Sequence, residues 1–182
     1  LLLSLALLLF ASPCLLAADH AAFAAPAPAP LSASQTARYT RKSEAFGATV
    51  PYMVYLPAGY GGGKRYPVWY TMHGYSSTES MWLTEAGVGK VADRLIESGM
   101  LAPMIMVFPL SRYDSAKVIE QDMADGKRGP SGMERFLCDE LVPLIDAQYA
   151  TLATSEHRYI GGFSMGGLFA LQIGLHRPDL FG

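Results

Sequence analysis

The sequence predicts an α/β domain whose sheet is mostly parallel and carries helices on both faces. From residue 66 onward, short and nearly continuous apolar runs alternate with segments of helical periodicity. Alternation of this kind is typical of a parallel sheet with helices packed on it. The composition, 51% hydrophobic and 16% charged over 182 residues, is sufficient for one globular domain and gives no indication of two.

The first half of the domain contains four predicted strands and one predicted helix. Residues 37–47 and 48–61 are rich in Tyr, Thr and Val and are closed by Gly and Pro, which indicates two antiparallel strands. Residues 66–74 and 103–109 are short apolar runs, typical of strands buried on both faces. Between them, residues 84–100 have apolar side chains at helical spacing.

The second half continues the alternation after a long polar excursion at residues 111–132. Residues 133–149 place their apolar side chains on one helical face, and Pro143 predicts a kink in that helix. Residues 157–163 predict a further buried strand, and residues 167–176 a helix that stops before Pro178.

The N-terminal 35 residues differ in composition from the rest. Residues 1–24 resemble the apolar core and cleavage region of a secretory signal peptide. A membrane anchor is the alternative, but Pro13 interrupts a run that is only marginally long for the roughly 20 residues of a span. We therefore expect a secreted or periplasmic protein with no stable membrane span after cleavage. Residues 25–35 predict an Ala/Pro-rich linker, and residues 36–182 the domain.

Several classes of function find no support in the sequence. The net charge is −2, and no basic patch suggests nucleic acid as a partner. No His-Glu-x-x-His motif or cysteine pair predicts a metal site, and the acidic residues of the excursion lack calcium-loop spacing. The glycines of residues 59–65 lack the ending of a phosphate loop, so we expect no cofactor. Cys138 is interpreted as a buried structural thiol, and the oligomeric state stays open.

Residues 162–166 match the pattern Gly-x-Ser-x-Gly around Ser164. A predicted strand ends directly before this serine, and a predicted helix begins directly after it. Such a tight turn strains the backbone at the serine, and Gly162 and Gly166 allow neighbouring segments to approach without a Cβ clash. The hydroxyl would then stand at the carboxyl end of the sheet, where α/β sheets bind ligands, as a catalytic nucleophile. The alternative is a glycine-rich structural turn with an idle serine.

A second candidate segment, Met-His-Gly-Tyr, follows the strand predicted at residues 66–74. Acyl transfer needs two N–H donors aimed at the developing oxyanion. In Gly-x-Ser-x-Gly hydrolases one donor follows the serine and the other comes from the loop after an earlier strand, which indicates Met165 and Tyr75. We interpret His73 as a packing or hydrogen-bonding residue of this turn. Tyr75, Trp82 and Tyr113 are candidates for lining a cleft, with simple packing as the alternative.

Three stretches, residues 66–82, 139–149 and 158–182, resemble in order and spacing the putative-esterase family of α/β-hydrolases. That family includes esterase D, feruloyl and acetylxylan esterases, enterochelin esterases and mycolyltransferases. The resemblance implies an α/β-hydrolase fold, Ser164 as nucleophile, and an oxyanion hole made by the backbone N–H groups of Met165 and Tyr75. It also implies a small-molecule or carbohydrate-linked ester as substrate.

The sequence departs from the family pattern after the serine. In such enzymes the acid and the base follow the nucleophile in the chain, but only 18 residues follow Ser164. His176 is 12 residues away on the same predicted helix, roughly 18 Å at 1.5 Å per residue, and out of hydrogen-bond reach. We expect the base, the acid and the C-terminal strands of the sheet to lie beyond Gly182, and this fragment alone to be inactive.

Three functions are therefore open. The leading hypothesis is a secreted serine hydrolase that cleaves carboxylic esters through an acyl-enzyme on Ser164. An acyltransferase of the mycolyl type would use the same nucleophile and pass the acyl group to a sugar hydroxyl. A non-catalytic exported binding module with an esterase-like fold is the third, and it would lack a downstream Asp or Glu and His.

Overall fold

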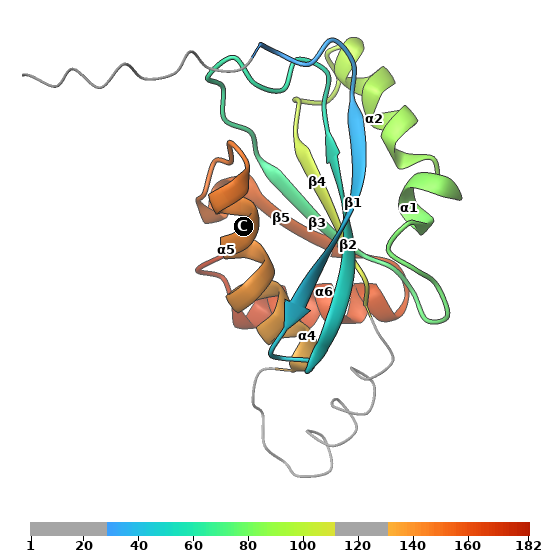
Figure 1. The fold of residues 1–182 in the computed structure, drawn as a ribbon, viewed down its shortest axis with the longest axis vertical. Coiled ribbons are helices and arrows are strands. Elements are labelled where there is room, and N and C mark those ends of the chain that lie inside the picture. Colours follow the sequence, from blue (N-terminus) through green and yellow to red (C-terminus); the bar gives the residue numbers. More distant parts are fainter. Residues whose placement is uncertain (1–28, 112–130) are drawn as a thin grey trace, which may run out of the picture.

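A computed structural model describes residues 29–111 and 131–182 of the chain. The predicted signal peptide, the start of the predicted linker, and residues 112–130 with Tyr113 and the acidic excursion lie outside the described residues. The described strands form one five-stranded sheet in the order β1-β2-β4-β3-β5, and helices cover both of its faces (Figure 1). The predicted α/β class is confirmed.

The two opening strands form the antiparallel part of the sheet. Strand β1 (Gln35–Ser43) pairs with β2 (Ala48–Leu56) along its whole length, from Gln35 opposite Leu56 to Ser43 opposite Ala48. The turn between them uses Gly47, whose φ of 59° is a left-handed value that glycine adopts without a Cβ penalty. Strand β2 then pairs antiparallel with β4, which joins this hairpin to the rest of the sheet.

The three apolar runs form the parallel part. Strand β3 (Val68–Met72) lies between β4 (Ile105–Pro109) and β5 (Arg158–Gly162) and runs parallel to both. All five residues of β4 are buried, as expected for a strand covered on both faces. Because β3 and β5 are parallel neighbours, the segments that follow them leave the sheet at the same edge.

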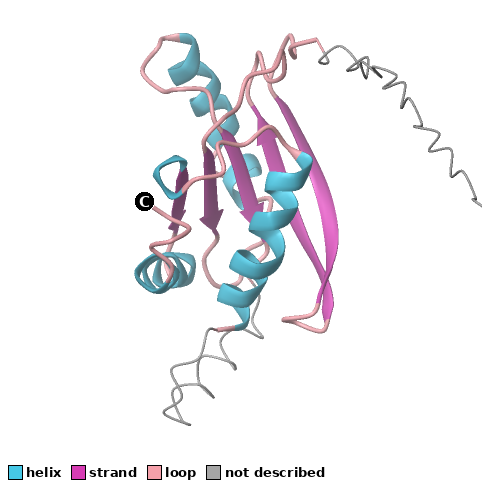
Figure 2. Ribbon diagram, turned by 90° about the vertical axis from the view of Figure 1, so that its left-hand side faces the viewer, coloured by secondary structure: helices cyan, strands magenta, loops and turns pink. Residues whose placement is uncertain are grey.

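The helices divide into two layers, which lie on either side of the sheet in Figure 1, and Figure 2 looks onto the layer that contains α5. Helices α1 (Met81–Thr84) and α2 (Val88–Glu97) cover one face, where Ala92 packs with Tyr55, Met106 and Phe108. The other face carries α4 (Gly132–Arg135), the π-helix η1 (Phe136–Leu141), α5 (Val142–Gln148) and α6 (Met165–His176). A short 3₁₀ helix, η2 (Ser155–His157), leads into β5. The two layers enclose two apolar clusters, one on each face of the sheet.

The helix with the predicted kink shows a different irregularity. Residues 132–148 are helical throughout, and the segment before the proline is a π-helix that ends with Val142 N–H donating to Leu137 C=O, five residues back. Pro143 therefore stands in the first turn of α5, directly after the π-helix. The wider π turn accommodates the proline without ending the helix.

Helix α6 has apolar side chains on both its buried and its exposed side, and its two polar residues are Gln172 and His176. Phe169, Ala170 and Ile173 are buried against the sheet. Leu168, Leu171 and Leu175, spaced three and four residues apart, are 56%, 63% and 73% exposed on the opposite side. The described residues contain no helix that is both long and apolar enough to cross a membrane.

The segment before β1 contacts the domain. Leu31 exchanges backbone hydrogen bonds with the Gly59–Tyr60 turn, at 2.9 Å from Leu31 N to Tyr60 O and 2.8 Å from Gly59 N to Leu31 O. The Ser34 hydroxyl donates to Asp93 of α2 over 2.8 Å. These contacts fix residues 31–34, within the predicted linker, against the loop after β2 and against α2.

Candidate active site

Ser164 occupies a strained turn between β5 and α6. Strand β5 ends at Gly162, and α6 begins at Met165. Ser164 has φ 53° and ψ −119°, and among the described non-glycine residues only Ser76 shares a positive φ. A side chain in this region of backbone space costs of order 1–3 kcal/mol and persists only where the surroundings enforce it. The residue is exposed, so the turn presents its hydroxyl at the surface.

Gly162 and Gly166, which flank the serine, must be glycine because backbone atoms approach them closely. A Cβ atom on Gly162 would lie 2.3 Å from the carbonyl carbon and oxygen of Gly166. A Cβ on Gly166 would lie 2.3 Å from the Met72 carbonyl oxygen at the end of β3. Both distances are far inside van der Waals contact with backbone atoms, which cannot move aside as a side chain does. The turn therefore packs tightly between its own helix and the neighbouring strand.

The loop after β3 lies beside this turn. The β3–β5 register pairs Met72 with Gly162, and Phe163 N–H donates to Met72 C=O over 3.1 Å. A Cβ on Gly74 would come within 3.0 Å of the Phe163 ring. The residues that follow each strand, Tyr75 on one and Ser164 on the other, are thus brought to one edge of the sheet, and Tyr75 is 53% exposed there.

The start of α6 adds a favourable electrostatic environment. The helix has 12 residues and no acidic residue in its first turn. Its N-terminal N–H groups and the positive end of its dipole lie next to Ser164, the residue that precedes Met165. This environment would stabilise a negative charge that develops on an acyl oxygen held at the turn.

His73 holds the loop after β3 in place through two hydrogen bonds. Its side chain is buried, and its Nε2 accepts a hydrogen bond from Ser111 N–H over 2.9 Å. Its Nδ1 is 2.7 Å from the Gly74 carbonyl oxygen, so Nδ1 carries the proton and donates it to that carbonyl. The ring is a neutral, fully bonded bridge between the ends of β3 and β4, which confirms the interpretation of His73 as a hydrogen-bonding residue.

The pH dependence of stability should report this bridge. Burial lowers the pKa of His73 below its ordinary 6.5, although the Gly74 carbonyl and Glu79 oppose the shift. The unfolded chain then binds a proton at a higher pH than the folded chain does, so the free energy of unfolding should fall as pH decreases from about 7 to about 5. Urea unfolding across this range measures the slope, which should flatten in a His73→Asn variant. His157→Asn, at an exposed histidine, is the control, and an unchanged slope in His73→Asn would contradict the expectation.

Two cavities open on either side of the Tyr75 loop. One, of about 480 Å³, is lined by Tyr75, Met165 and a polar wall that includes Arg38 and Glu79. The other, of about 400 Å³, is lined by Tyr75, Phe163, Met81 and Trp82, among others. Phe163 and Met165 are the two chain neighbours of Ser164, so each cavity has one of them in its lining, and the two cavities share Tyr75 and Ser77. Of the predicted cleft residues, Tyr75 and Trp82 line them.

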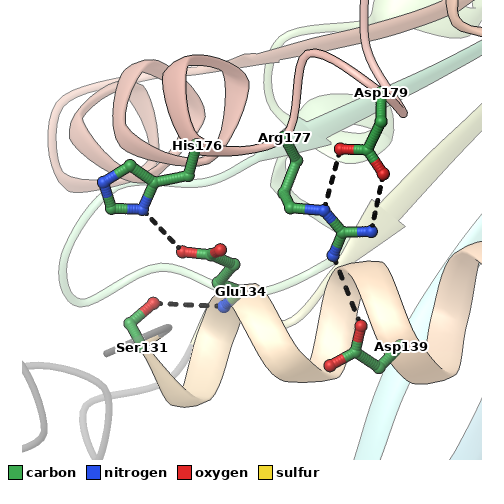
Figure 3. A network of polar contacts seen from close by, with 6 residues as sticks. All are labelled: Ser131, Glu134, Asp139, His176, Arg177 and Asp179. Carbon is green, nitrogen blue, oxygen red and sulfur yellow. Dashed lines mark hydrogen bonds and ion pairs between the residues drawn. The ribbon is translucent and has the colours of Figure 1, made fainter. Parts of the chain in front are cut away.

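The remaining described histidines are bonded elsewhere. At the far end of α6, His176 Nδ1 lies 3.1 Å from Glu134 Oε2, and Arg177 joins Asp139 and Asp179 in the same network (Figure 3). His157 is 3.1 Å from the Thr154 hydroxyl, before β5 begins. Within residues 29–111 and 131–182, the structure brings no histidine–carboxylate pair to Ser164.

The described residues show no group of three or more His, Cys, Asp or Glu side chains placed to hold a metal. Cys138 is buried, and burial raises the pKa of its thiol to about 12. A thiol with so high a pKa carries no thiolate near neutral pH, so it is inert as a nucleophile.

The sequence analysis did not predict the ion pair between Arg38 and Glu79, two residues that line the larger of these cavities. The Arg38 Nε of β1 lies 2.6 Å from Glu79 Oε1, and the Glu79 side chain is only 7% exposed. The two residues are 41 positions apart, and no sequence motif links them. A carboxylate in the polar run at residues 76–80 is the one signal that could have drawn attention to it.

A family model, a curated relative and solved structures all show similarity to esterases. A family model described as "Putative esterase" matches residues 43–182. The chain is 37% identical over 145 residues to the endo-1,4-beta-xylanase/feruloyl esterase of Xylanibacter ruminicola, a match that covers 77% of this chain and 19% of that protein. A solved ferulic acid esterase superposes with a TM-score of 0.69 at 31% identity, over 82% of this chain and 57% of the other.

A ferulic acid esterase from the anaerobic fungus Anaeromyces mucronatus also has a TM-score of 0.69, at 26% identity, over 82% of this chain and 56% of that one. The chain thus spans little more than half the length of these solved structures and about a fifth of the xylanase/feruloyl esterase.

Proposed function

The chain belongs to the putative-esterase family and has the α/β-hydrolase fold, and from this premise we propose that the protein hydrolyses carboxylic esters with Ser164 as its nucleophile. The observation that supports the proposal most is the backbone of Ser164. A strained, exposed serine at a strand-to-helix turn is the geometry in which Gly-x-Ser-x-Gly hydrolases present their nucleophile. A structural turn with an idle serine would gain nothing from this strain, because glycine would adopt the same backbone without cost.

The proposed reaction has two steps. In the first, Ser164 Oγ bonds to the acyl carbon, its proton passes to a base, and the alcohol leaves with that proton. In the second, water attacks the acyl-enzyme, releases the acid and restores the serine. The backbone N–H groups of Met165 and Tyr75 would donate to the oxyanion in both steps, since the two residues line the same cavity next to Ser164.

The base and its acid partner are not among the described side chains near Ser164. His73 has both ring nitrogens engaged, and His176 and His157 have partners away from the serine. The solved ferulic acid esterase is longer than the matched part of this chain. We therefore propose that the His and the Asp or Glu belong to a part of the family fold that this chain does not represent.

Relatives suggest the first substrate to test. Those named above are a feruloyl esterase and ferulic acid esterases, so esters of ferulic acid are the proposed class. The proposed location is secreted or periplasmic, based on the signal-peptide pattern of residues 1–24. Residues 25–35 are proposed as a linker and residues 36–182 as the N-terminal portion of the hydrolase domain.

Covalent labelling tests the proposal directly. The full-length gene product should hydrolyse methyl ferulate and lose that activity on treatment with a fluorophosphonate, which forms a stable adduct only with an activated serine. Peptide mass spectrometry should place the adduct on Ser164. The thirteen-residue stretch around it, residues 159–171, contains no other serine, so the assignment is unambiguous. An adduct elsewhere in an active preparation would contradict the assignment of Ser164.

A further inference from the structure

The loop between β3 and α1 contains a strained backbone position. Ser76 has a φ of 62°, and Ser164 is the only other described non-glycine residue with a positive φ. Ser77 N–H donates to Gly74 C=O over 3.3 Å. This bond closes a four-residue turn with Tyr75 and Ser76 at its centre. A positive φ at the third residue is what a type II turn requires, and glycine or asparagine normally stands there. A serine in this conformation persists only where its surroundings hold it, and such positions are concentrated at functional sites.

His73 anchors one end of this turn. Its Nδ1 donates to the Gly74 carbonyl, the same oxygen that closes the turn, and its Nε2 accepts a hydrogen bond from Ser111 N–H after β4. The residue is 2% exposed, so the turn starts from a buried side chain with both ring nitrogens bonded. This anchor fixes the start of the turn and leaves its far end to be held by other contacts.

Glu79 anchors the far end of the turn. Its side chain is 7% exposed, and its Oε1 lies 2.6 Å from Arg38 Nε of β1. Arg38 stands opposite Met53 in the β1–β2 register, and Met53 packs in the apolar cluster on the α1–α2 face of the sheet. Since directly paired residues share a face, Arg38 lies on the side where the loop continues into α1. Charge-assisted hydrogen bonds are the strong ones, so this pair ties the loop firmly to the sheet.

Resting on the proposed function, we propose that Glu79, held by Arg38, is a positioning residue that fixes the turn so that Tyr75 N–H is aimed at the oxyanion before substrate binds. Electrostatic stabilisation of this kind depends on donors that need no reorganisation at the moment of reaction. A strained turn held between two anchors meets that requirement, because the anchors keep Ser76 from relaxing. In this role Glu79 and Arg38 act through the backbone of the turn and do not touch the reacting atoms.

Glu79→Gln tests the assignment, because glutamine keeps the shape of the side chain and removes its charge. With the full-length protein and methyl ferulate, kcat should fall about tenfold, the effect of losing one charge-assisted hydrogen bond, and KM should stay within about twofold of the wild-type value. A donor that acts only on the oxyanion stabilises the transition state and not the bound substrate. The loss of a whole oxyanion donor sets an upper limit of about 10²–10³-fold.

A transition-state analogue gives a second readout that a purely structural role would not change. In a trifluoromethyl ketone analogue of methyl ferulate, the serine oxygen bonds to the ketone carbon and the ketone oxygen becomes an oxyanion. The inhibition constant of this analogue should rise about tenfold in Glu79→Gln, in step with the fall in kcat, because the adduct uses the same donors as the transition state.

Arg38→Gln removes the other half of the pair. The Arg38 side chain is 56% exposed, so this variant keeps the test open if Glu79→Gln does not fold. It should also lower kcat about tenfold with little change in KM. The double variant Arg38→Gln/Glu79→Gln should be no slower than the slower single variant, because two residues that act as one unit give non-additive effects.

Arg41→Gln and Glu140→Gln are the matched controls. Arg41 also lies on β1, and its Nε is 3.7 Å from Oε2 of Glu140, a carboxylate of η1 whose side chain is 13% exposed. This pair also ties β1 to another element, but neither residue lines a cavity that contains Tyr75. Both variants should keep wild-type kcat, whatever the change in their midpoint of urea unfolding.

The outcomes separate the two levels of the proposal. Wild-type kcat in both Glu79→Gln and Arg38→Gln, or a rise in KM that accounts for the whole loss of kcat/KM, would overturn the positioning role and leave Ser164 as the proposed nucleophile. An equal loss of kcat in Arg41→Gln and Glu140→Gln would also overturn it, since the effect would then come from general destabilisation. Absence of methyl ferulate hydrolysis by the wild-type protein would overturn the proposed function, and this inference with it.

Discussion

Replacing Ser164 with alanine is expected to lower kcat for ester hydrolysis by at least about 10⁴-fold, because the variant lacks the hydroxyl on which we propose that the acyl-enzyme forms. The free energy of unfolding should change little, since alanine keeps the Cβ and the strained φ of 53°.

A Ser164→Gly variant should be equally inactive but more stable by about 1 kcal/mol, because glycine relieves that strain. Initial rates with methyl ferulate and urea unfolding measure the two quantities.

Ser98→Ala serves as the control for the serine series. Ser98 caps α2, and its hydroxyl donates to Leu95 C=O at an exposed site remote from the turn. This variant should retain wild-type kcat and lose at most about 1 kcal/mol of stability. If Ser164→Ala kept more than about 1% of wild-type kcat, the serine would not be the nucleophile.

Replacing Gly166 with alanine is expected to destabilise the fold by about 3 kcal/mol or more, or to prevent folding. The new Cβ would lie 2.3 Å from Met72 O, 2.6 Å from His73 O and 2.6 Å from the Met72 carbonyl carbon. These are backbone atoms of the buried residues Met72 and His73 at the end of β3, so relief requires α6 to move away from that strand. Urea unfolding of the full-length protein measures the change.

Gly174→Ala is a matched control in the same helix. A Cβ at Gly174 would meet only Ile160 Cγ2, at an ordinary 3.5 Å. Alanine there should stabilise the protein by about 0.5–1 kcal/mol, because it lowers the conformational entropy of the unfolded chain and suits a helix interior. Equal stabilities for the two variants would mean that β3 and α6 do not approach as closely as the structure has them.

The strands and the serine turn were predictable because local patterns encode them. The apolar runs at residues 66–74, 103–109 and 157–163 became β3, β4 and β5, and the glycine spacing around Ser164 indicated the tight turn. The helical pattern at residues 84–100 became a shorter α2 that begins only after Gly87, whose φ of 62° interrupts the run. Helical periodicity does not show where a left-handed residue breaks it.

The cavities were not predictable, because they depend on contacts between distant residues. The Arg38–Glu79 pair and the His73–Ser111 bond join positions 41 and 38 residues apart. Neither pair leaves a periodic or spaced signature in one sequence. The π-helix was missed for a related reason: Pro143 signals a disturbance, but whether the helix breaks or widens depends on how its buried face, with Phe136 and Leu141, packs on the sheet.

The leucine row on the outer side of α6 has a practical consequence for handling this polypeptide. The side chains of Leu168, Leu171 and Leu175 form an exposed hydrophobic patch. Such patches promote self-association. Residues 29–182 produced alone would tend to aggregate in concentrated solution. An absence of activity in such a sample would not test the role of Ser164, so activity should be measured on the full-length gene product.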